Sequence, residues 1–494
     1  MANKRKSHRK TQSTPAAKES TWQRVKISGE LITKTALHIG SGEEELRGIT
    51  NQIGDTELHR VNVLLRDARG EPYIPGSTLR GFLRRQFSDH TIRDRLFGSA
   101  RQPADSDAHG NAGALRVYDA ALRTTSPLLQ CTTRNSIDNL TGTTREHHLS
   151  NHEEVPAQSI FDVDIWFDSR GPDISSNDIA AILSALARLS SDGIGKSKSI
   201  GLGQLIWKTH RIEGLTSSSI KSWLRKEIRS FNDNRAPKEG PLQRWNKSFS
   251  TIRTPAVNES YLLSPLWTPL SLKLTATSQV LVGGFANIIE DEDQSVKAPQ
   301  LEAKAPQLEA QKRGNVAVIP GSTLKGWFRA HSRRILMTLT QGEHEHQIDD
   351  ALGEMFGSLT SGQSTLRFYD ARCPQADMVR RYFNAVDRFS GGVKDTALFS
   401  AEAVQRGSVF CADLSYHRTA LRGWMKLLLF FVVHDALAGD LVLGWGKARG
   451  LGELQLALDT DTTPDWLSII DASRLRSWEE DLHHRIGLQQ RAVS

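Results

Sequence analysis

Hydrophobic and polar positions alternate in two stretches of the chain, and this alternation predicts β-strands. The first stretch is RVKISGELITKTALHIG, residues 24–40, and the second is LSLKLTATSQVLVGG, residues 270–284. Apolar residues at helical spacing predict helices over residues 77–88, 178–190, 322–337 and 421–438. Short antiparallel strands flanked by helices indicate an α+β sandwich in each half of the chain.

The same sequence motifs recur in both halves, in the same order. The pairs are YIPGSTLRGFLRRQF (73–87) and VIPGSTLKGWFRAHS (318–332), LFGS (96–99) and MFGS (355–358), LRVYDA (115–120) and LRFYDA (366–371), RNSIDNLTG (134–142) and FNAVDRFSG (383–391), and GIGKSKSIGLGQL (193–205) and GWGKARGLGEL (444–454). Self-similarity at one spacing, here about 250 residues, is the signature of a repeated unit. We therefore predict two tandem copies of one domain.

Changes in composition divide the chain around these copies. The segment between them is polar and basic, contains proline, and has one predicted helix near SIKSWLRKEIRSF. We predict a disordered basic tail over residues 1–23, a first domain over 24–213, a linker or insertion over 214–264, a second domain over 265–458, and a C-terminal extension over 459–494.

Length and composition exclude several classes of protein. A chain of 494 residues is too long for one ordinary core. Its longest apolar run, LLLFFVV at 427–433, is too short to span a membrane and is predicted to be a buried helix. The start lacks the apolar stretch of a secretion signal, so we expect a cytoplasmic protein. The three cysteines form no CxxC pair, which argues against a disulfide framework and against a cysteine zinc site.

The formal net charge of +7 comes mostly from the basic tail. Residues 1–23 hold six lysines and arginines against Glu19, and the remaining chain is nearly neutral. Such a tail is either a solvating extension or a non-specific contact with a polyanion. An argument for nucleic-acid binding must therefore depend on where the charges of the folded part lie.

The repeated IPGST helix has an unusual polar face. Ser77 or Thr78 is placed to cap it, while the arginine pair Arg80 and Arg84 shares a face away from the apolar positions. The second copy substitutes Lys325 and Arg329. Paired like charges cost a few tenths of a kcal/mol.

A glycine inside each of these helices, Gly81 and Gly326, costs about 1 kcal/mol more. A bound phosphate would offset these costs, since the helix N-terminus and the cations attract an anion and the glycine lets a backbone approach. The alternative is a solvated basic face with glycines that permit helix packing.

Each glycine-rich loop follows a helix and precedes a strand. A nucleotide-binding loop has the opposite order, so we predict no organic cofactor. The cations in these loops, Lys196, Lys198, Lys447 and Arg449, suit a polyphosphate backbone. The alternative is an ordinary glycine-rich hairpin with exposed lysines.

Taken together, these motifs and NSIDNLTGTTREHHLSNHEEVPAQSIF (135–161) resemble the RAMP superfamily of CRISPR-associated proteins, in particular the backbone subunits of type III effector complexes. The resemblance covers both copies and is most like the tandem fusions of type III-D. It implies two ferredoxin-like, RRM-like domains, each with a thumb-like β-hairpin insertion after YDA. It also implies three kinds of partner: a CRISPR guide RNA held at two consecutive positions, a complementary target RNA, and other subunits of the complex, with no membrane.

The motifs and the resemblance together give the candidate RNA-binding residues. They are Ser77, Arg80, Arg84, Asn135, Asp138, Lys196 and Lys198 in the first copy, and Ser322, Lys325, Arg329, Asn384, Arg388, Lys447 and Arg449 in the second. If both copies act alike, they present equivalent cationic grooves to successive stretches of one RNA strand.

The resemblance also implies an aspartate, in the loop before the IPGST helix, that supports metal-dependent cutting of target RNA. In the first copy its position falls at Val61 and Asn62, and Asp55 and Asp67 lie nearby but out of register. The second copy offers Asp291 and Asp293, which are the candidate catalytic residues and ligands for Mg²⁺ or Mn²⁺. The alternative for this acidic run is a solvated loop.

Two histidine-rich segments, REHHLSNHEE (145–154) and EHEHQIDD (343–350), lack the spacing of a helical zinc site. We expect the first to contact RNA and the second to be an exposed loop. For the whole chain two other functions stay open, a guide-processing endoribonuclease of the same superfamily and a polyanion-binding scaffold.

Overall fold

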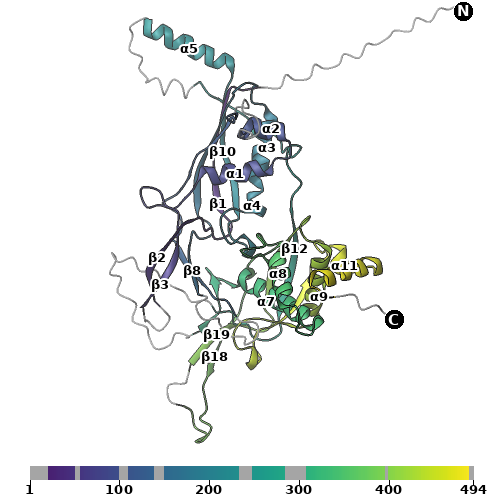
Figure 1. Ribbon diagram of the computed structural model, residues 1–494. Helices are drawn as coiled ribbons and strands as arrows, with labels where there is room; N and C mark the ends of the chain where they lie inside the picture. Colours follow the sequence, from purple (N-terminus) through teal and green to yellow (C-terminus); the bar gives the residue numbers. More distant parts are fainter. Residues whose placement is uncertain are drawn as a thin grey trace, which may run out of the picture.

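The computed structural model describes residues 21–50, 56–99, 110–137, 149–232, 248–283, 308–394 and 399–488. It contains two modules, one above the other in Figure 1. The first module runs from strand β1 to strand β11, and the second runs from strand β12 to helix α11. Each has its own hydrophobic core, so each satisfies the requirement for an independent folding unit.

The first module is built on a seven-stranded sheet of order β11-β10-β1-β9-β6-β4, in which β5 also pairs with β9. The strands are β1 (Arg24–Thr33), β4 (Tyr73–Ile74), β5 (Leu115–Val117), β6 (Ala120–Leu122), β9 (Ile160–Asp168), β10 (Leu205–Leu215) and β11 (Ser250–Thr251). Strand β1 is central, and its Ile27 faces Ile165 on one side and Ile212 on the other. All three side chains are buried, because the alternating pattern of β1 places every second residue in the core.

The described residues of the first module also form helices, of which α1, α3 and α4 contact strands of this sheet. They are α1 (Gly76–Gln86), α2 (His90–Phe97), α3 (Ser176–Ala187), α4 (Leu189–Asp192), the 3₁₀ turn η1 (Lys198–Ile200) and α5 (Ser217–Asn232). Helix α3 begins with a capping box, in which Ser175 and Asp178 satisfy each other's backbone amides. Figure 1 shows α5 extending away from the rest of the module.

The end of the predicted linker belongs to the first module. Strand β11 pairs with β10, and Leu262 packs into the first core. Arg188 holds the segment in place by donating to the Leu263 carbonyl at 2.5 Å and pairing with Glu259 at 3.1 Å. The chain therefore leaves the first module just before β12.

The second module repeats the architecture with an eight-stranded sheet of order β14-β15-β17-β20-β12-β22-β21, in which β16 also pairs with β20. The strands are β12 (Trp267–Ala276), β14 (Lys312–Arg313), β15 (Val316–Ile319), β16 (Leu366–Phe368), β17 (Ala371–Cys373), β20 (Val409–His417), β21 (Leu441–Val442) and β22 (Glu453–Leu458). Strand β12 is central here, as β1 is in the first module, and lies between β20 and β22. The predicted α+β class and the internal duplication are confirmed.

The helices of the second module are α7 (Gly321–Leu339), α8 (Glu345–Phe356), α9 (Gly423–Leu437), the 3₁₀ turn η2 (Lys447–Arg449), α10 (Asp465–Ser468) and α11 (Ala472–Arg485). Helix α9 carries the longest apolar run, and its Leu427, Leu428 and Leu429 are fully buried. The run is a core helix because other elements cover it from several sides, including α11 and α10. Among the described helices none is long and apolar enough to cross a membrane.

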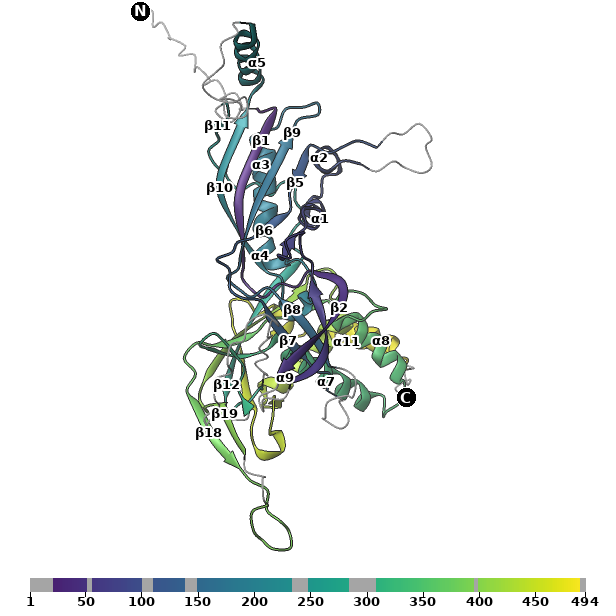
Figure 2. The same cartoon turned by 90° about the vertical axis from the view of Figure 1, so that its left-hand side faces the viewer.

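Each module also carries a smaller sheet, which we call its side sheet. The first side sheet has the order β2-β3-β8-β7, from β2 (Gly40–Thr50), β3 (Thr56–Leu64), β7 (Gln130–Arg134) and β8 (Ser150–Glu154). The second has the order β13-β19-β18, from β13 (Leu308–Glu309), β18 (Met378–Phe383) and β19 (Phe399–Val404). Both lie on the left of Figure 1, which is the side turned toward the viewer in Figure 2.

Candidate nucleic-acid interface

The N-termini of the two repeated helices are capped by the aspartate of each YDA motif. Helices α1 and α7 begin at Gly76 and Gly321, and neither has a side-chain cap of its own. Instead Asp119 Oδ1 accepts from the Gly76 amide at 2.7 Å, and Asp370 Oδ1 accepts from the Gly321 amide at 2.9 Å. The prediction that Ser77 or Thr78 caps the helix is therefore wrong.

This carboxylate occupies the place that the sequence had suggested for a phosphate. The glycine is required beside it, since a Cβ at Gly76 would lie 2.2 Å from the Val117 carbonyl oxygen, and one at Gly321 would lie 2.3 Å from that of Phe368. The repeated LRxYDA motif was the sequence signal for this arrangement. It pointed to a duplicated role, but not to helix capping.

In the first module the predicted arginine pair lines an open cavity. Arg80 donates to the Phe97 carbonyl, and Arg84 donates to the Gly98 carbonyl at 2.9 Å. Both line a cavity of about 680 Å³, whose other wall is formed by residues 111–118. Two cations facing an open cavity suit an anionic ligand.

In the second module one cation of the equivalent pair, Lys325, is half-buried against the first module. Lys325 Nζ donates to Ser199 Oγ of the first module at 2.9 Å. Burial, with a smaller contribution from the positive charge of Arg329, lowers the pKa of Lys325 to about 8. Arg329 approaches the Leu352 carbonyl at 3.5 Å. The two grooves are not equivalent, which corrects the expectation that both copies present the same cations.

One face of each repeated helix is nevertheless open. Gly81 and Gly326 are exposed, and a Cβ built at either would meet no described atom within 4 Å. Ser77 and Ser322 lie one turn earlier on the same face, exposed and half-buried respectively. Helix packing therefore does not explain these glycines, and a side chain at either position would point outward.

The glycines of the two loops serve the packing of the chain itself. We call residues 193–205 the first glycine loop and residues 444–454 the second. A Cβ at Gly203 would lie 1.9 Å from the Ile194 carbonyl oxygen, and one at Gly452 would lie 2.0 Å from that of Leu443. Both have positive φ angles, which favour glycine. The ordinary hairpin interpretation thus explains the glycines, but not the cations at the tips.

The glycine-loop cations lie in three different settings. Lys447 and Arg449 are exposed at the tip of the second loop. Lys198 is half-buried where the modules meet, and burial, followed by the charges of Arg85 and Arg367, lowers its pKa. The Lys196 backbone amide bonds the His38 carbonyl at 2.9 Å, which fixes the start of the first loop.

Each glycine loop contributes a cation beside its module's side sheet. In the first module, the Lys196 amide donates to the His38 carbonyl at 2.9 Å, and His38 Nδ1 lies 2.7 Å from the Glu153 carbonyl oxygen on β8. In the second, the Arg449 guanidinium lies over the Trp445 ring at 4.7 Å and over the Phe383 ring at 5.6 Å. The fold thus places the glycine loops that carry Lys196 and Arg449 next to the side sheets from which the thumb-like segments extend.

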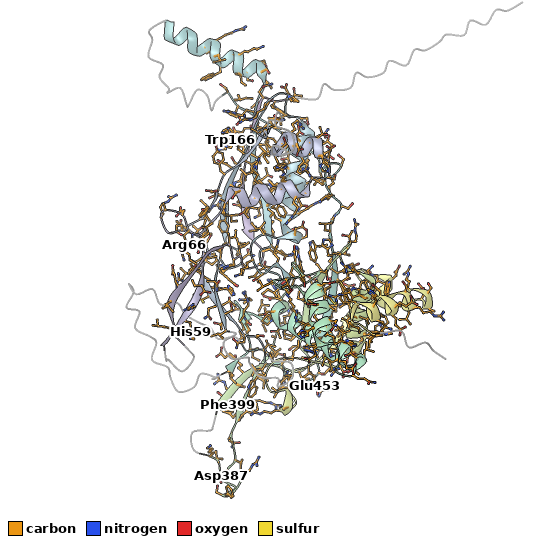
Figure 3. All side chains as sticks on the ribbon, viewed as in Figure 1. His59, Arg66, Trp166, Asp387, Phe399 and Glu453 are labelled. Atoms are coloured by element: carbon orange, nitrogen blue, oxygen red, sulfur yellow. The ribbon has the colours of Figure 1, made fainter. Side chains whose placement is uncertain are left out.

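The thumb-like segment of the second module is an exposed hairpin. Figure 3 shows Phe399 near its base and Asp387 near its far end. Asp387 Oδ1 accepts from the Phe389 and Ser390 amides, and these bonds lower its pKa and order the tip. Exposed along the hairpin are Arg381, Tyr382, Asn384, Arg388 and Phe389, of which Arg381, Tyr382 and Phe389 were not among the predicted residues. The sequence alone did not identify Tyr382 and Phe389, because it does not show whether an aromatic side chain is buried in a core or exposed to a ligand.

The thumb-like segment of the first module is described only in part. Asn135 is exposed beyond the end of β7, whereas Asp138 lies outside the described residues. Residues 151–154 of the first histidine-rich segment are buried in β8, which corrects the expectation that this part contacts RNA. The second histidine-rich segment starts helix α8 at Glu345 instead of forming a loop.

Buried carboxylates hold the first side sheet together. Glu153 pairs with Arg47 at 3.0 Å and with Arg66 at 2.5 Å, and also accepts from the Leu64 amide. Glu154 pairs with Arg134 on the neighbouring strand. Because arginines already neutralise both carboxylates, neither is available to a metal ion.

The expected aspartate position of the first module carries no carboxylate. Val61 is fully buried, and Asn62 donates to the Asn151 carbonyl at 3.3 Å. Asp67 orders a turn by accepting from the Arg69 and Glu71 amides, which lowers its pKa. Asp55, Asp291 and Asp293 lie outside the described residues.

One group of three possible metal ligands occurs among the described residues, His331, Asp435 and Asp440. His331 Nε2 lies 2.6 Å from Asp435 Oδ2, and Arg334 pairs with Asp440 at 3.2 Å. Arg334 also approaches His331 Nε2 at 3.4 Å. A guanidinium already supplies the positive charge here, so this group is an ion-pair network between α7 and the end of α9.

Comparison with known proteins identifies the family to which the two modules belong. The model of the RAMP superfamily matches residues 30–206 and again residues 261–455. The chain is also similar to the CRISPR system Cms endoribonuclease Csm3 of Methanocaldococcus jannaschii, with 27% identity over 242 residues, which cover 42% of this chain and 91% of that protein. The two matched ranges fall on the two modules described above. The chain therefore belongs to the RAMP superfamily and carries two tandem copies of its domain.

Proposed function

We propose that this chain is a backbone subunit of a type III CRISPR ribonucleoprotein. Its two modules bind consecutive segments of the guide RNA and present them to a complementary target RNA, together with other subunits. The observation that carries the proposal is that in each module a cation-bearing glycine loop packs beside the side sheet, through Lys196 and His38 in the first and through Arg449 and Phe383 in the second. Both side sheets lie on one side of the molecule, where a single strand could follow them (Figure 2).

The exposed hairpin of the second module has the chemistry of single-stranded RNA binding. Arg381 and Arg388 supply positive charge for phosphates, while Tyr382 and Phe389 are 68% and 100% exposed. Aromatic rings stack on bases without regard to sequence, and arginines neutralise the backbone. A guide RNA, whose sequence varies, requires this kind of contact.

The open helix faces fit the same role. Ser77 with Gly81, and Ser322 with Gly326, leave space beside an exposed backbone in both modules. A ribose-phosphate strand could approach there without displacing a side chain. Arg84, on the wall of the first module's cavity, would then meet a phosphate.

Binding is tested by purifying the full chain under low-salt, nuclease-free conditions and measuring guide RNA affinity by filter binding. Phe389→Ala is expected to weaken binding about fivefold to a hundredfold, since one stacked base contributes about 1–3 kcal/mol. Ile469→Ala is the matched control, because Ile469 is 77% exposed and lies outside the side sheets. Equal affinities for both variants and the unmodified chain would contradict the proposal.

We also propose that the second module supports cleavage of the target RNA through Asp291 and Asp293. The support is the resemblance to a protein named as an endoribonuclease and the buried Val61 at the corresponding position of the first module. Mg²⁺ or Mn²⁺ held by these carboxylates would activate the attacking hydroxyl. The test is a target-cleavage assay on the assembled complex with Asp291→Ala and Asp293→Ala, separately and together. Unchanged cutting at every position would remove this assignment and leave the binding role intact.

A further inference from the structure

The two modules meet where the first glycine loop lies against the first turn of α7 and the LRFYDA motif. A Cβ at Gly201 would lie 2.7 Å from the Tyr369 ring, and one at Gly321 would lie 2.9 Å from the Ile200 carbonyl oxygen. The two backbones are therefore in close contact. A charged side chain at this contact loses part of its hydration, so it needs a partner of opposite charge or a hydrogen-bond acceptor.

Three cations and one histidine gather at this contact, and we call them the intermodule cluster. They are Arg85 at the end of α1, Lys198 in η1, Arg367 in β16 and His417 in β20. Burial is the largest cause that lowers the pKa values of Lys198, Arg367 and His417, and neighbouring positive charges of the cluster lower them further. Groups that shift one another's pKa values in this way lie within the range of direct electrostatic interaction.

A single carboxylate balances these charges among the described residues. It belongs to Asp192, whose negative charge raises the pKa values of three members of the cluster. Both of its oxygens already accept hydrogen bonds, Oδ2 from the Gln86 amide group at 2.9 Å and Oδ1 from the Ser191 hydroxyl at 3.2 Å. Positive charge is therefore in excess at this contact.

Two donors of the cluster have no acceptor in the part of the chain that the structure describes. Arg367 is only 3% exposed, and its Nη1 donates to the Ser191 carbonyl at 2.8 Å, but its Nε is buried without a hydrogen-bond partner. Lys198 is half-buried, and no hydrogen bond or ion pair to a described residue supports its ammonium group. Buried charged donors without an acceptor are rare in folded proteins, because each one is costly.

The first module shows which group the second module lacks. Arg116 occupies the sequence position of Arg367, and it pairs with Asp168 on the neighbouring strand β9. In the second module the strand register places His417 where Asp168 lies in the first. The carboxylate that neutralises this arginine in one module is thus replaced by a neutral or positive ring in the other.

We propose that a small oxyanion of the phosphate class binds in the intermodule cluster, where it accepts from the Arg367 Nε and the Lys198 ammonium and links the two modules. A tetrahedral oxyanion accepts several charge-assisted hydrogen bonds at once. The ligand is a free ion and not a strand of RNA, because the Arg367 guanidinium lies 3.6 Å from the centre of the Trp267 ring and is enclosed. A polymer needs an open groove instead. The proposal does not depend on guide RNA binding.

Equilibrium dialysis against radiolabelled inorganic phosphate tests this site, with the full chain freed of nucleic acid by nuclease treatment and high-salt washing. A single saturable phosphate site is expected. Lys198→Met and Arg367→Met should each lower the affinity about tenfold or more, since each removes a charged donor. Lys273→Met is the matched control and should bind as the unmodified chain does, because Lys273 is exposed on β12, six residues from Trp267.

Urea unfolding gives a second measurement that does not depend on the folding of the Arg367 variant. At constant ionic strength, replacing chloride by phosphate should raise the urea midpoint of the unmodified chain, because phosphate binds only the folded state. It should not raise the midpoint of Lys198→Met. Without phosphate, Lys198→Met should unfold at a higher urea concentration than the unmodified chain, since it lacks the uncompensated charge. If Lys198 only packs between the modules, its variant has a lower midpoint and keeps the response to phosphate.

Several outcomes would overturn the proposal. They are the absence of saturable phosphate binding, equal binding by Lys198→Met and the unmodified chain, and a loss in Arg80→Met alone, which would place the anion in the cavity of the first module. Displacement of phosphate by guide RNA, with Lys198→Met weakening the binding of both, would assign the site to the RNA backbone. If guide RNA fails to bind in the filter assay while phosphate still does, the proposed function is removed and this inference stands.

Discussion

The two copies of the IPGST helix differ in what covers them. In the second module the first glycine loop lies on α7 and partly covers Lys325, whereas in the first module α1 borders an open cavity of about 680 Å³. The sequences of the two helices are nearly the same over IPGSTL, so local sequence does not set the difference. The contact between the modules sets it, because the glycine loop of the first module packs on the helix of the second. A duplicated motif therefore need not perform a duplicated function.

The largest expected effect comes from a side chain placed between the first glycine loop and Tyr369, where the two modules are in close contact. Gly201→Ala introduces a Cβ about 2.7 Å from the Tyr369 ring, at a positive φ that opposes any side chain. We expect the free energy of unfolding, measured by urea denaturation, to fall by about 2–4 kcal/mol. Gly450→Ala is the matched control, because its φ is also positive but no described atom lies within 4 Å of its Cβ position, so its loss is about 1 kcal/mol. If both variants lose the same unfolding free energy, Gly201 does not pack closely against Tyr369.

Lys325 is half-buried where the two modules meet, so the stability of this contact depends on pH. Its pKa is about 8 in the folded chain and 10.5 when exposed, so below pH 8 both states are protonated and the full penalty of burying the charge is present. Between pH 8 and 10.5 the folded state releases this proton first, and stability rises with pH. Compared with Lys325→Met, the unmodified chain is expected to gain about 1–3 kcal/mol between pH 7 and 10.

Urea titrations of both proteins at each pH measure this difference. Lys325→Arg is the control, since arginine stays protonated throughout this range and should show no such gain over Lys325→Met. If the unfolding free energies of the unmodified chain and of Lys325→Arg change alike with pH, Lys325 is not shielded from solvent by the first module.

The aspartates that cap α1 and α7 make the same contact in both modules, so their removal tests whether the two modules share this role. Asp119→Ala and Asp370→Ala each remove the acceptor for the first amide of a repeated helix, so each is expected to cost about 1 kcal/mol of unfolding free energy. Thermal or urea unfolding measures the loss. The corresponding asparagine variants keep an oxygen acceptor and should lose less. A large loss in one module and none in the other would show that capping is not the shared role of the YDA aspartate.

Sequence reasoning could predict what depends on local patterns. The alternation over residues 24–40 and 270–284 predicted the central strands β1 and β12, and the ordered motifs predicted the duplication. It could not predict that Asp119 and Asp370 cap their helices, because the acceptor lies more than forty residues away in sequence. Nor could it predict the partial burial of Lys325, which depends on how one module packs against the other.

The smallest expected change in stability comes from the helix glycines, Gly81 and Gly326. Their variants also test the proposed RNA binding most directly. Gly81→Ala and Gly326→Ala should each stabilise the free chain by up to about 1 kcal/mol, because alanine is the better helix former and its Cβ meets no described atom within 4 Å. If RNA approaches these faces closely, the same methyl groups weaken guide binding even as they raise stability. Urea unfolding and filter binding measure the two effects on the same proteins. Increased stability with unchanged affinity at both positions would exclude RNA from the open helix faces, whereas weaker binding at Gly81 alone would confine RNA to the module whose helix is uncovered.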